Sequence, residues 1–187
     1  TEDFSEEAAT EDLQDLEVLR ANALHWATRK GGSAEGLARV YVLTGDQFDL
    51  RAARRFSRGR DDDLEIIRAL VDHGDDGDVV KASFIMEGMP RGSVHRAKAA
   101  MLIDAHHGEP VDHGNAIKSI ESVEDSLEAV KLFCEMAVHR DDQRHWEMVL
   151  NAIETRFPGK PKDQDRAWME CAVAQATAGH SNTAAQM

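Results

Sequence analysis

Residues 31–88 decide the fold, and they read GGSAEGLARVYVLTGDQFDLRAARRFSRGRDDDLEIIRALVDHGDDGDVVKASFIMEG. Glycines punctuate this stretch at steps of 14, 14, 15 and 14 residues, counted from Gly31 through Gly45, Gly59 and Gly74 to Gly88. The segments between them are rich in Ala, Leu, Arg, Glu and Asp. Because glycine readily takes the left-handed conformation that ends many helices, the pattern predicts one short helix per step, each closed by its glycine.

The composition of the whole chain predicts an all-α fold of about ten short to medium helices. Of the 187 residues, 42% are apolar, which is enough for a core, and only 5% are aromatic. Strands favour β-branched and aromatic residues, and no convincing alternation of apolar and polar residues predicts one here. Short connections favour antiparallel neighbours. We therefore expect either a helical-repeat array or an irregular helical bundle.

The two ends of the chain are expected to lie outside the helical domain. Residues 1–17 hold eight acids and no base, and residues 1–10 are predicted to be a flexible acidic lead-in. A helix is expected to begin at Glu11, and one helical-repeat domain is expected to occupy residues 11–179. Residues 180–187 are interpreted as a tail.

The charge balance narrows the classes of partner. The chain has 35 acidic and 22 basic residues, and its net charge is −13. A general nucleic-acid binder needs a cationic surface, so this balance argues against one, and it equally disfavours anionic membranes. No apolar run is long enough to span a bilayer, and no leader peptide is visible. Cys134 and Cys171 are interpreted as buried free thiols, which favours a cytoplasmic location.

The C-terminal stretch 167–184 resembles a known repeat. Trp168, Cys171, Ala172 and Ala184 occupy the places where a tetratricopeptide repeat has its Trp, its Leu and its two small residues. Gln175 departs from the pattern, because an aromatic residue is expected there. The segment is therefore similar to a degenerate tetratricopeptide repeat. The resemblance implies a concave surface that holds a peptide or a partner helix.

A local basic face contrasts with the acidic chain. It consists of five arginines, namely Arg51, Arg54, Arg55, Arg58 and Arg60. Such a face binds phosphate, nucleic acid or an acidic peptide, and the overall charge favours an acidic segment of a partner. The alternative is a solvated helix face that Asp61–Asp63 neutralise. The residues predicted to contact a partner are Tyr41, Arg51, Arg54, Arg55, Arg58 and Trp146.

A cluster of histidines and acids supports a rival interpretation. It comprises Asp104, His106, His107, Glu109, Asp112 and His113. These residue types ligate zinc and other divalent metals. Their spacing matches no helical metal signature, and no His-Glu-x-x-His motif occurs. The alternative is a polar turn whose histidines lie at a helix C-terminus, where cations are favoured.

The sequence therefore favours a non-enzymatic interaction module without a cofactor. It would act as an adaptor, a chaperone or a regulatory subunit that holds another protein or a peptide. The rival is a metal-dependent enzyme or metal-binding helical protein that uses His106, His107 and His113. A third interpretation is an acidic mimic of nucleic acid. The sequence contains neither a Gly-rich phosphate loop nor a Gly-x-Ser-x-Gly motif. It predicts neither the partner's identity nor the oligomeric state.

Overall fold

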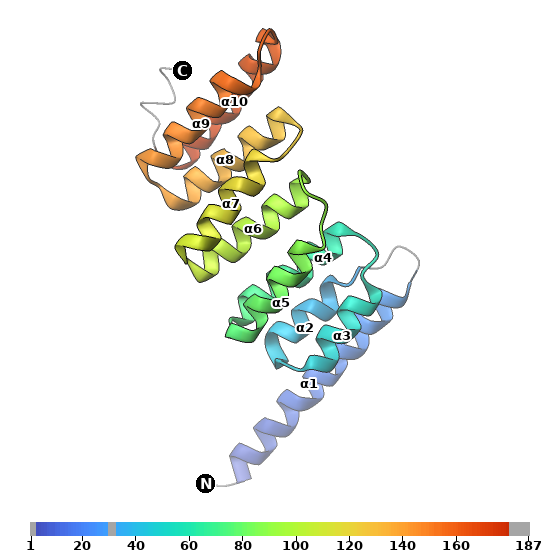
Figure 1. Cartoon of the computed structure of the whole chain (residues 1–187). Coiled ribbons are helices and arrows are strands. Elements are labelled where there is room, and N and C mark those ends of the chain that lie inside the picture. The colour runs from blue at the N-terminus through green and yellow to red at the C-terminus, as the bar shows by residue number, and fades with distance from the viewer. Residues whose placement is uncertain (1–2, 30–32, 180–187) are drawn as a thin grey trace. The chain divides into compact units, whose positions relative to one another are not determined.

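The structure, a computed structural model, describes residues 3–29 and 33–179. Within these residues the protein is all-helical, with ten helices and no strand (Figure 1). The predicted all-α fold class is therefore confirmed. The helices are α1 (Asp3–Thr28), α2 (Glu35–Thr44), α3 (Gln47–Phe56), α4 (Arg60–His73), α5 (Asp76–Glu87), α6 (Val94–His107), α7 (Pro110–Glu121), α8 (Ser126–Arg140), α9 (Gln143–Arg156) and α10 (Pro161–Thr177).

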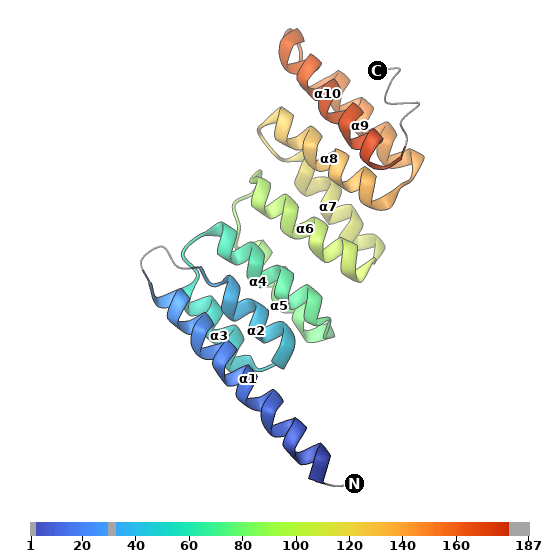
Figure 2. The same ribbon diagram turned by 180° about the vertical axis from the view of Figure 1, so that it is seen from behind.

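The helices divide into two compact units. Unit 1 comprises Thr1–Gly88 and Ala105–His107, and unit 2 comprises Met89–Asp104 and Gly108–Met187. In unit 1, α2 packs against α1, α3 and α4, and α4 packs against α5. In unit 2, α8 packs against α7, α9 and α10 (Figures 1 and 2). In each unit a helix thus contacts both the next helix and the next but one, as in stacked helical hairpins.

Small residues bring α1 and α2 close together in unit 1. Ala23 and Ala27 of α1 are buried, with exposed fractions of 8% and 0%. Gly36 of α2 lies so near that a Cβ atom added there would be 3.3 Å from the Cβ atom of Ala23. The core of the unit continues in α4, where Ile67 and Leu70 are fully buried. Ile67 and Leu70 are three positions apart, which places them on one face of the helix.

The glycines mark the ends of the helical segments as predicted, but only some of them end a helix in the left-handed conformation. Gly45 and Gly74 close α2 and α4 in the left-handed conformation, with φ angles of 64° and 77°. Gly59 has extended backbone and is the N-cap of α4, whereas α3 ends at Phe56 with Ser57 as its C-cap. Gly88 follows α5 with φ −71°. The first glycine of the pattern lies outside the described residues, so the prediction of a left-handed glycine after every helix is corrected.

The first helix begins earlier than predicted, and the last begins with a proline. Helix α1 begins at Asp3 instead of Glu11, so most of the expected lead-in is helical. Helix α10 begins at Pro161, in the first turn, where a missing N–H group costs little. The predicted tail lies outside the described residues.

Helix α8 forms the centre of unit 2. Asp125 caps its start by accepting hydrogen bonds from the backbone N–H groups of Leu127 and Glu128 at 2.9 and 3.0 Å. Val130 and Ala137 are completely buried against the neighbouring helices.

None of the described helices is both long enough and apolar enough to cross a lipid bilayer.

A buried ion pair ties α1 to α3 in unit 1. The carboxylate of Asp49 is 0% exposed, and it accepts two hydrogen bonds from the guanidinium of Arg20, both at 2.7 Å. The hydroxyl of Thr44 donates a third at 3.0 Å. Arg20 also reaches Asp46 at 3.1 Å near the surface. Because Asp49 is the fully buried partner, the arrangement depends on Arg20 to compensate its charge.

Candidate functional site

Three exposed arginines lie together on α3. Asp46 fixes the start of this helix, because its carboxylate accepts a hydrogen bond from the backbone N–H of Phe48 at 2.8 Å. The helical period then turns Arg51, Arg54 and Arg55 toward solvent. We call these residues the α3 arginine surface. Phe48 is 56% exposed and lies three residues before Arg51, so an aromatic ring borders the surface.

Asp62 and Asp63, two of the acids that follow α3, are held by hydrogen bonds to other groups. Asp62 accepts hydrogen bonds from the Ser33 hydroxyl at 2.8 Å and from the backbone N–H groups of Ala34 and Arg58 at 3.1 and 2.8 Å. Burial alone raises the pKa of Asp62, but these bonds outweigh it and hold the pKa below its usual value. Asp63 accepts from a serine hydroxyl at 2.7 Å. Within the described residues, no ion pair joins the α3 arginine surface to an acid.

Arg58 differs from the three arginines of α3. It follows the helix, and its guanidinium donates a hydrogen bond to the backbone carbonyl of Ala27 at 2.9 Å. This bond ties the α3–α4 connection to the end of α1. Because Arg58 lies after the end of α3 and its guanidinium is held against the end of α1, we leave it out of the α3 arginine surface.

Tyr41 lies in the core of unit 1. Its side chain is 0% exposed, and its hydroxyl donates a hydrogen bond to Asp78 at 2.5 Å and accepts one from Gln47 at 3.3 Å. Burial, together with the bond to Asp78, raises the pKa of Tyr41 to about 12. A side chain without exposed area offers nothing to a partner. The structure therefore corrects the expectation that Tyr41 is a contact residue.

Asp78 is the centre of a buried polar cluster. Its carboxylate lies 2.6 Å from Nδ1 of His73 and 2.6 Å from Nζ of Lys81, in addition to its bond with Tyr41. Burial by itself raises the pKa of Asp78, but the hydrogen bonds from Lys81, Tyr41 and His73 outweigh it and hold the pKa below its usual value. The cluster joins α2, α4 and α5, so we assign it a structural role.

Trp146 is the predicted contact residue of unit 2. It lies on α9, with Val149 and Ile153 on the same buried face, and it is 9% exposed. Its position follows from the helical period, which places all three inward. The structure therefore corrects this expectation as well and assigns Trp146 to the core of unit 2.

Unit 2 contains a line of four side chains in which two adjacent imidazoles lie between two carboxylates. Asp104 Oδ2 lies 3.1 Å from His113 Nδ1, His113 Nε2 lies 3.1 Å from His145 Nε2, and His145 Nδ1 lies 2.6 Å from Asp142 Oδ1. Arg140 donates to the other oxygen of Asp104 at 2.5 Å. Asp104 and His145 are 3% and 5% exposed. The line joins α6, α7 and the start of α9, and each imidazole lies between a carboxylate and the other imidazole.

The three predicted metal ligands are distributed differently. His113 belongs to this line, whereas His106 and His107 end α6 with exposed side chains. His106 lies beside Gly74, where an added Cβ atom would be 3.3 Å from its ring. Among the described residues, no group of three or more His, Cys, Asp or Glu side chains is placed to hold a metal ion. The predicted set is therefore corrected: the neighbour of His113 is His145, which sequence reasoning missed.

The sequence contains a local signal for the contact between Asp142 and His145. Asp142 precedes His145 by three residues at a helix start, and it accepts a hydrogen bond from the backbone N–H of His145 at 3.0 Å, as a capping residue does. The same spacing brings its carboxylate to the imidazole. The contact with His113 joins residues 32 positions apart, and only the packing of the helices reveals it.

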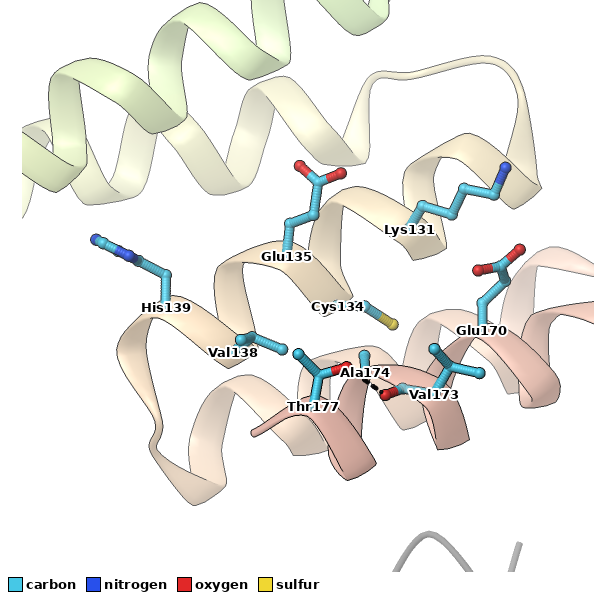
Figure 3. Close-up of a pocket in the computed structure, with 9 residues that line it drawn as sticks. All are labelled: Lys131, Cys134, Glu135, Val138, His139, Glu170, Val173, Ala174 and Thr177. Atoms are coloured by element: carbon cyan, nitrogen blue, oxygen red, sulfur yellow. Dashed lines mark hydrogen bonds between the residues drawn. The ribbon is translucent and has the colours of Figure 1, made fainter. Parts of the chain in front are cut away.

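An open groove lies between α8 and α10 (Figure 3). Its volume is about 630 Å³. Figure 3 shows that the thiol of Cys134 points toward α10. The lining mixes apolar side chains with charged ones and consists of Lys131, Cys134, Glu135, Val138, His139, Glu170, Val173, Ala174 and Thr177.

The two cysteines are buried free thiols, as predicted, and we expect them to react slowly in the folded protein. Cys134 and Cys171 are 4% and 0% exposed. The hydrogen bond between them, together with burial, raises the pKa of the Cys134 thiol. The same bond lowers the pKa of the Cys171 thiol, but this side chain has no exposed area that a reagent can reach. Both thiols should react with dithionitrobenzoate only after unfolding in urea. Rapid reaction of Cys134 in the native protein, followed by absorbance, would contradict this expectation.

No family model, curated protein or solved structure matches this chain. Its function is therefore argued from its own residues. The α3 arginine surface presents three cations to solvent, and the line from Asp104 to Asp142 brings two imidazoles together in the interior of unit 2. The first arrangement suits recognition of carboxylates, and the second suits the binding of a cation.

Proposed function

We propose that the protein is an interaction module whose α3 arginine surface binds an acidic segment of another protein. The observation that carries the proposal is that Arg51, Arg54 and Arg55 are exposed together, without an acid of the described residues to pair with. Guanidinium groups bind carboxylates through paired hydrogen bonds. Arginine and aromatic residues dominate the binding energy of interfaces, and Phe48 supplies an exposed ring. The proposal requires no cofactor and no catalytic step.

The charge of the chain favours a short acidic segment over nucleic acid. With a net charge of −13, the protein repels a long polyanion that extends beyond one helix. At physiological salt, charges separated by more than about 8 Å are largely screened. A segment that contacts α3 alone therefore experiences mainly the three local arginines.

The proposal also includes the protein's role in the cell. We place the protein among adaptors, chaperones or regulatory subunits, and its resemblance to tetratricopeptide repeats stays a prediction. The contact of a helix with its next and next-but-one neighbours in each unit is equally consistent with a repeat array and with a helical bundle. A cytoplasmic location is also proposed, because free thiols are kept in reducing compartments.

The variant Arg54→Glu/Arg55→Glu tests the proposal. We expect it to bind a fluorescein-labelled, glutamate-rich peptide with one central leucine more than about tenfold more weakly than the wild type, because each charge-assisted bond contributes about 1.5–3 kcal/mol. Both side chains are exposed, so the fold should be retained. Fluorescence anisotropy with the full chain measures the affinity. Wild-type binding should weaken as salt is added.

The matched control is Arg144→Glu/Arg166→Glu, which makes the same charge change at exposed positions of unit 2. It should bind the peptide like the wild type. Equal weakening by the control would show that the net charge, and not α3, attracts the peptide. Tighter binding of a labelled DNA duplex than of the peptide would contradict the choice of partner. Self-association that Arg54→Glu/Arg55→Glu abolishes would identify a second copy as the occupant and overturn the proposal.

A further inference from the structure

His113 and His145 face each other through their Nε2 atoms, which lie 3.1 Å apart. On the opposite side of each ring, Nδ1 lies against a carboxylate, at 3.1 Å from Asp104 and at 2.6 Å from Asp142. An ionised carboxylate only accepts hydrogen bonds, so both Nδ1 atoms must carry the hydrogen. In the neutral form of each ring the lone pair is then on Nε2, and the two lone pairs face each other.

Two facing lone pairs repel each other unless a cation lies between them. A proton would convert one ring to imidazolium, whereas a metal ion would bind both Nε2 atoms. The ring centroids of His113 and His145 are 5.0 Å apart, and the ring planes make an angle of 71°. This separation is shorter than it would be if both rings pointed straight along the line between the nitrogens. A hydrogen bond between the rings would be strongest with the donor ring pointing straight at the other nitrogen. Two rings that bind one metal ion instead both point at the ion, which lies to one side of the line between the nitrogens.

The distances and the outer partners suit a metal ion. With Zn–N bonds of about 2.0–2.1 Å, nitrogens separated by 3.1 Å subtend roughly 100° at the ion, close to the tetrahedral angle. Carboxylates on the outer nitrogens orient the rings, as they do in zinc sites. Asp104 is itself held by Arg140. Burial of His145 and Asp104 keeps the pair in place before any ion binds.

We propose that His113 and His145 bind a first-row transition-metal ion of the zinc class through their Nε2 atoms, with water completing its coordination. Imidazole ligands select such ions over Mg²⁺ and Ca²⁺, which prefer oxygen. The site lies in unit 2 and does not depend on the α3 arginine surface. An ion bound there would link α7 to α9, so it should stabilise the folded state.

The test uses the full chain, prepared without a histidine tag and stripped of metal with a chelator. Titration calorimetry with Zn²⁺ should show one ion bound per chain, and the melting temperature should rise with Zn²⁺ but not with Mg²⁺. Titration with Co²⁺ should produce visible absorption bands that report nitrogen ligation. The variants His113→Gln and His145→Gln should each remove the calorimetric signal and the bands. Asp142→Asn keeps both ligands and should weaken binding about 10–100-fold.

The matched control is His106→Gln/His107→Gln, which removes two exposed histidines from outside the pair. It should bind Zn²⁺ like the wild type. The proposal is overturned if the wild type binds no Zn²⁺, which would mean that a proton alone occupies the gap, or if His113→Gln binds as well as the wild type. Circular dichroism checks that each variant is folded. Should the buried change at His145 prevent folding, His113→Gln and Asp142→Asn decide the question.

Discussion

The variant Arg20→Met is expected to lower the free energy of unfolding by about 3–5 kcal/mol, because it leaves a buried carboxylate without its cation. Asp49 is 0% exposed and receives two hydrogen bonds from Arg20 at 2.7 Å. Without the guanidinium, the Thr44 hydroxyl at 3.0 Å is the remaining side-chain donor among the described residues. Urea unfolding followed by far-ultraviolet circular dichroism measures the loss.

The opposite change, Asp49→Asn, is expected to cost less, about 1–2 kcal/mol. Arg20 has a side chain that is 33% exposed, so its freed guanidinium is hydrated and keeps Asp46 at 3.1 Å. The double variant should be more stable than Arg20→Met alone, since no buried charge remains. Asp49→Asn that destabilises the protein more than Arg20→Met would contradict the assignment of Asp49 as the partner that depends on compensation.

The helices were predictable because their signals are local. Asp46 and Ser93 cap α3 and α6, and such a signal is local because a cap needs only the N–H groups two or three residues later. The partner of Asp49 was not predictable, because Arg20 is 29 residues away on another helix. The helical period shows that α3 has a buried face, but it does not reveal which helix covers that face.

Candidate residues at the surface were likewise predictable from local signals, whereas those in the interior were not. The period of α3 predicts an outward position for Arg54 and Arg55, and the structure places both at the surface. Tyr41 is predicted from the sequence as a contact residue, yet its hydroxyl is satisfied inside the protein by Asp78. Sequence spacing cannot show that a phenol meets a carboxylate 37 residues further along the chain. Residues that act at the surface are therefore predicted better than those that meet in the interior.

Tyr41 is expected to titrate at about 12 in the folded protein, because burial and the bond to Asp78 both oppose the phenolate. In the unfolded chain its pKa should return to about 10. The folded pKa is the higher of the two, so this contribution to stability is complete below pH 10 and is lost as the pH rises to about 12. A difference of about two between the folded and unfolded pKa values corresponds to roughly 2.7 kcal/mol of unfolding free energy. The chain has one tyrosine, so phenolate absorbance reports Tyr41 alone.

Two variants separate the causes of this shift. Tyr41→Phe removes the phenolate signal, and the difference between its alkaline stability profile and that of the wild type isolates the contribution of the hydroxyl. Asp78→Asn removes the carboxylate charge but keeps an oxygen that accepts the hydrogen bond from Tyr41. Because burial is the larger cause, the pKa of Tyr41 in this variant should fall below that of the wild type yet stay above 10. A native midpoint of about 10 in the wild-type protein would contradict the buried position of the hydroxyl, since a hydrated phenol titrates there.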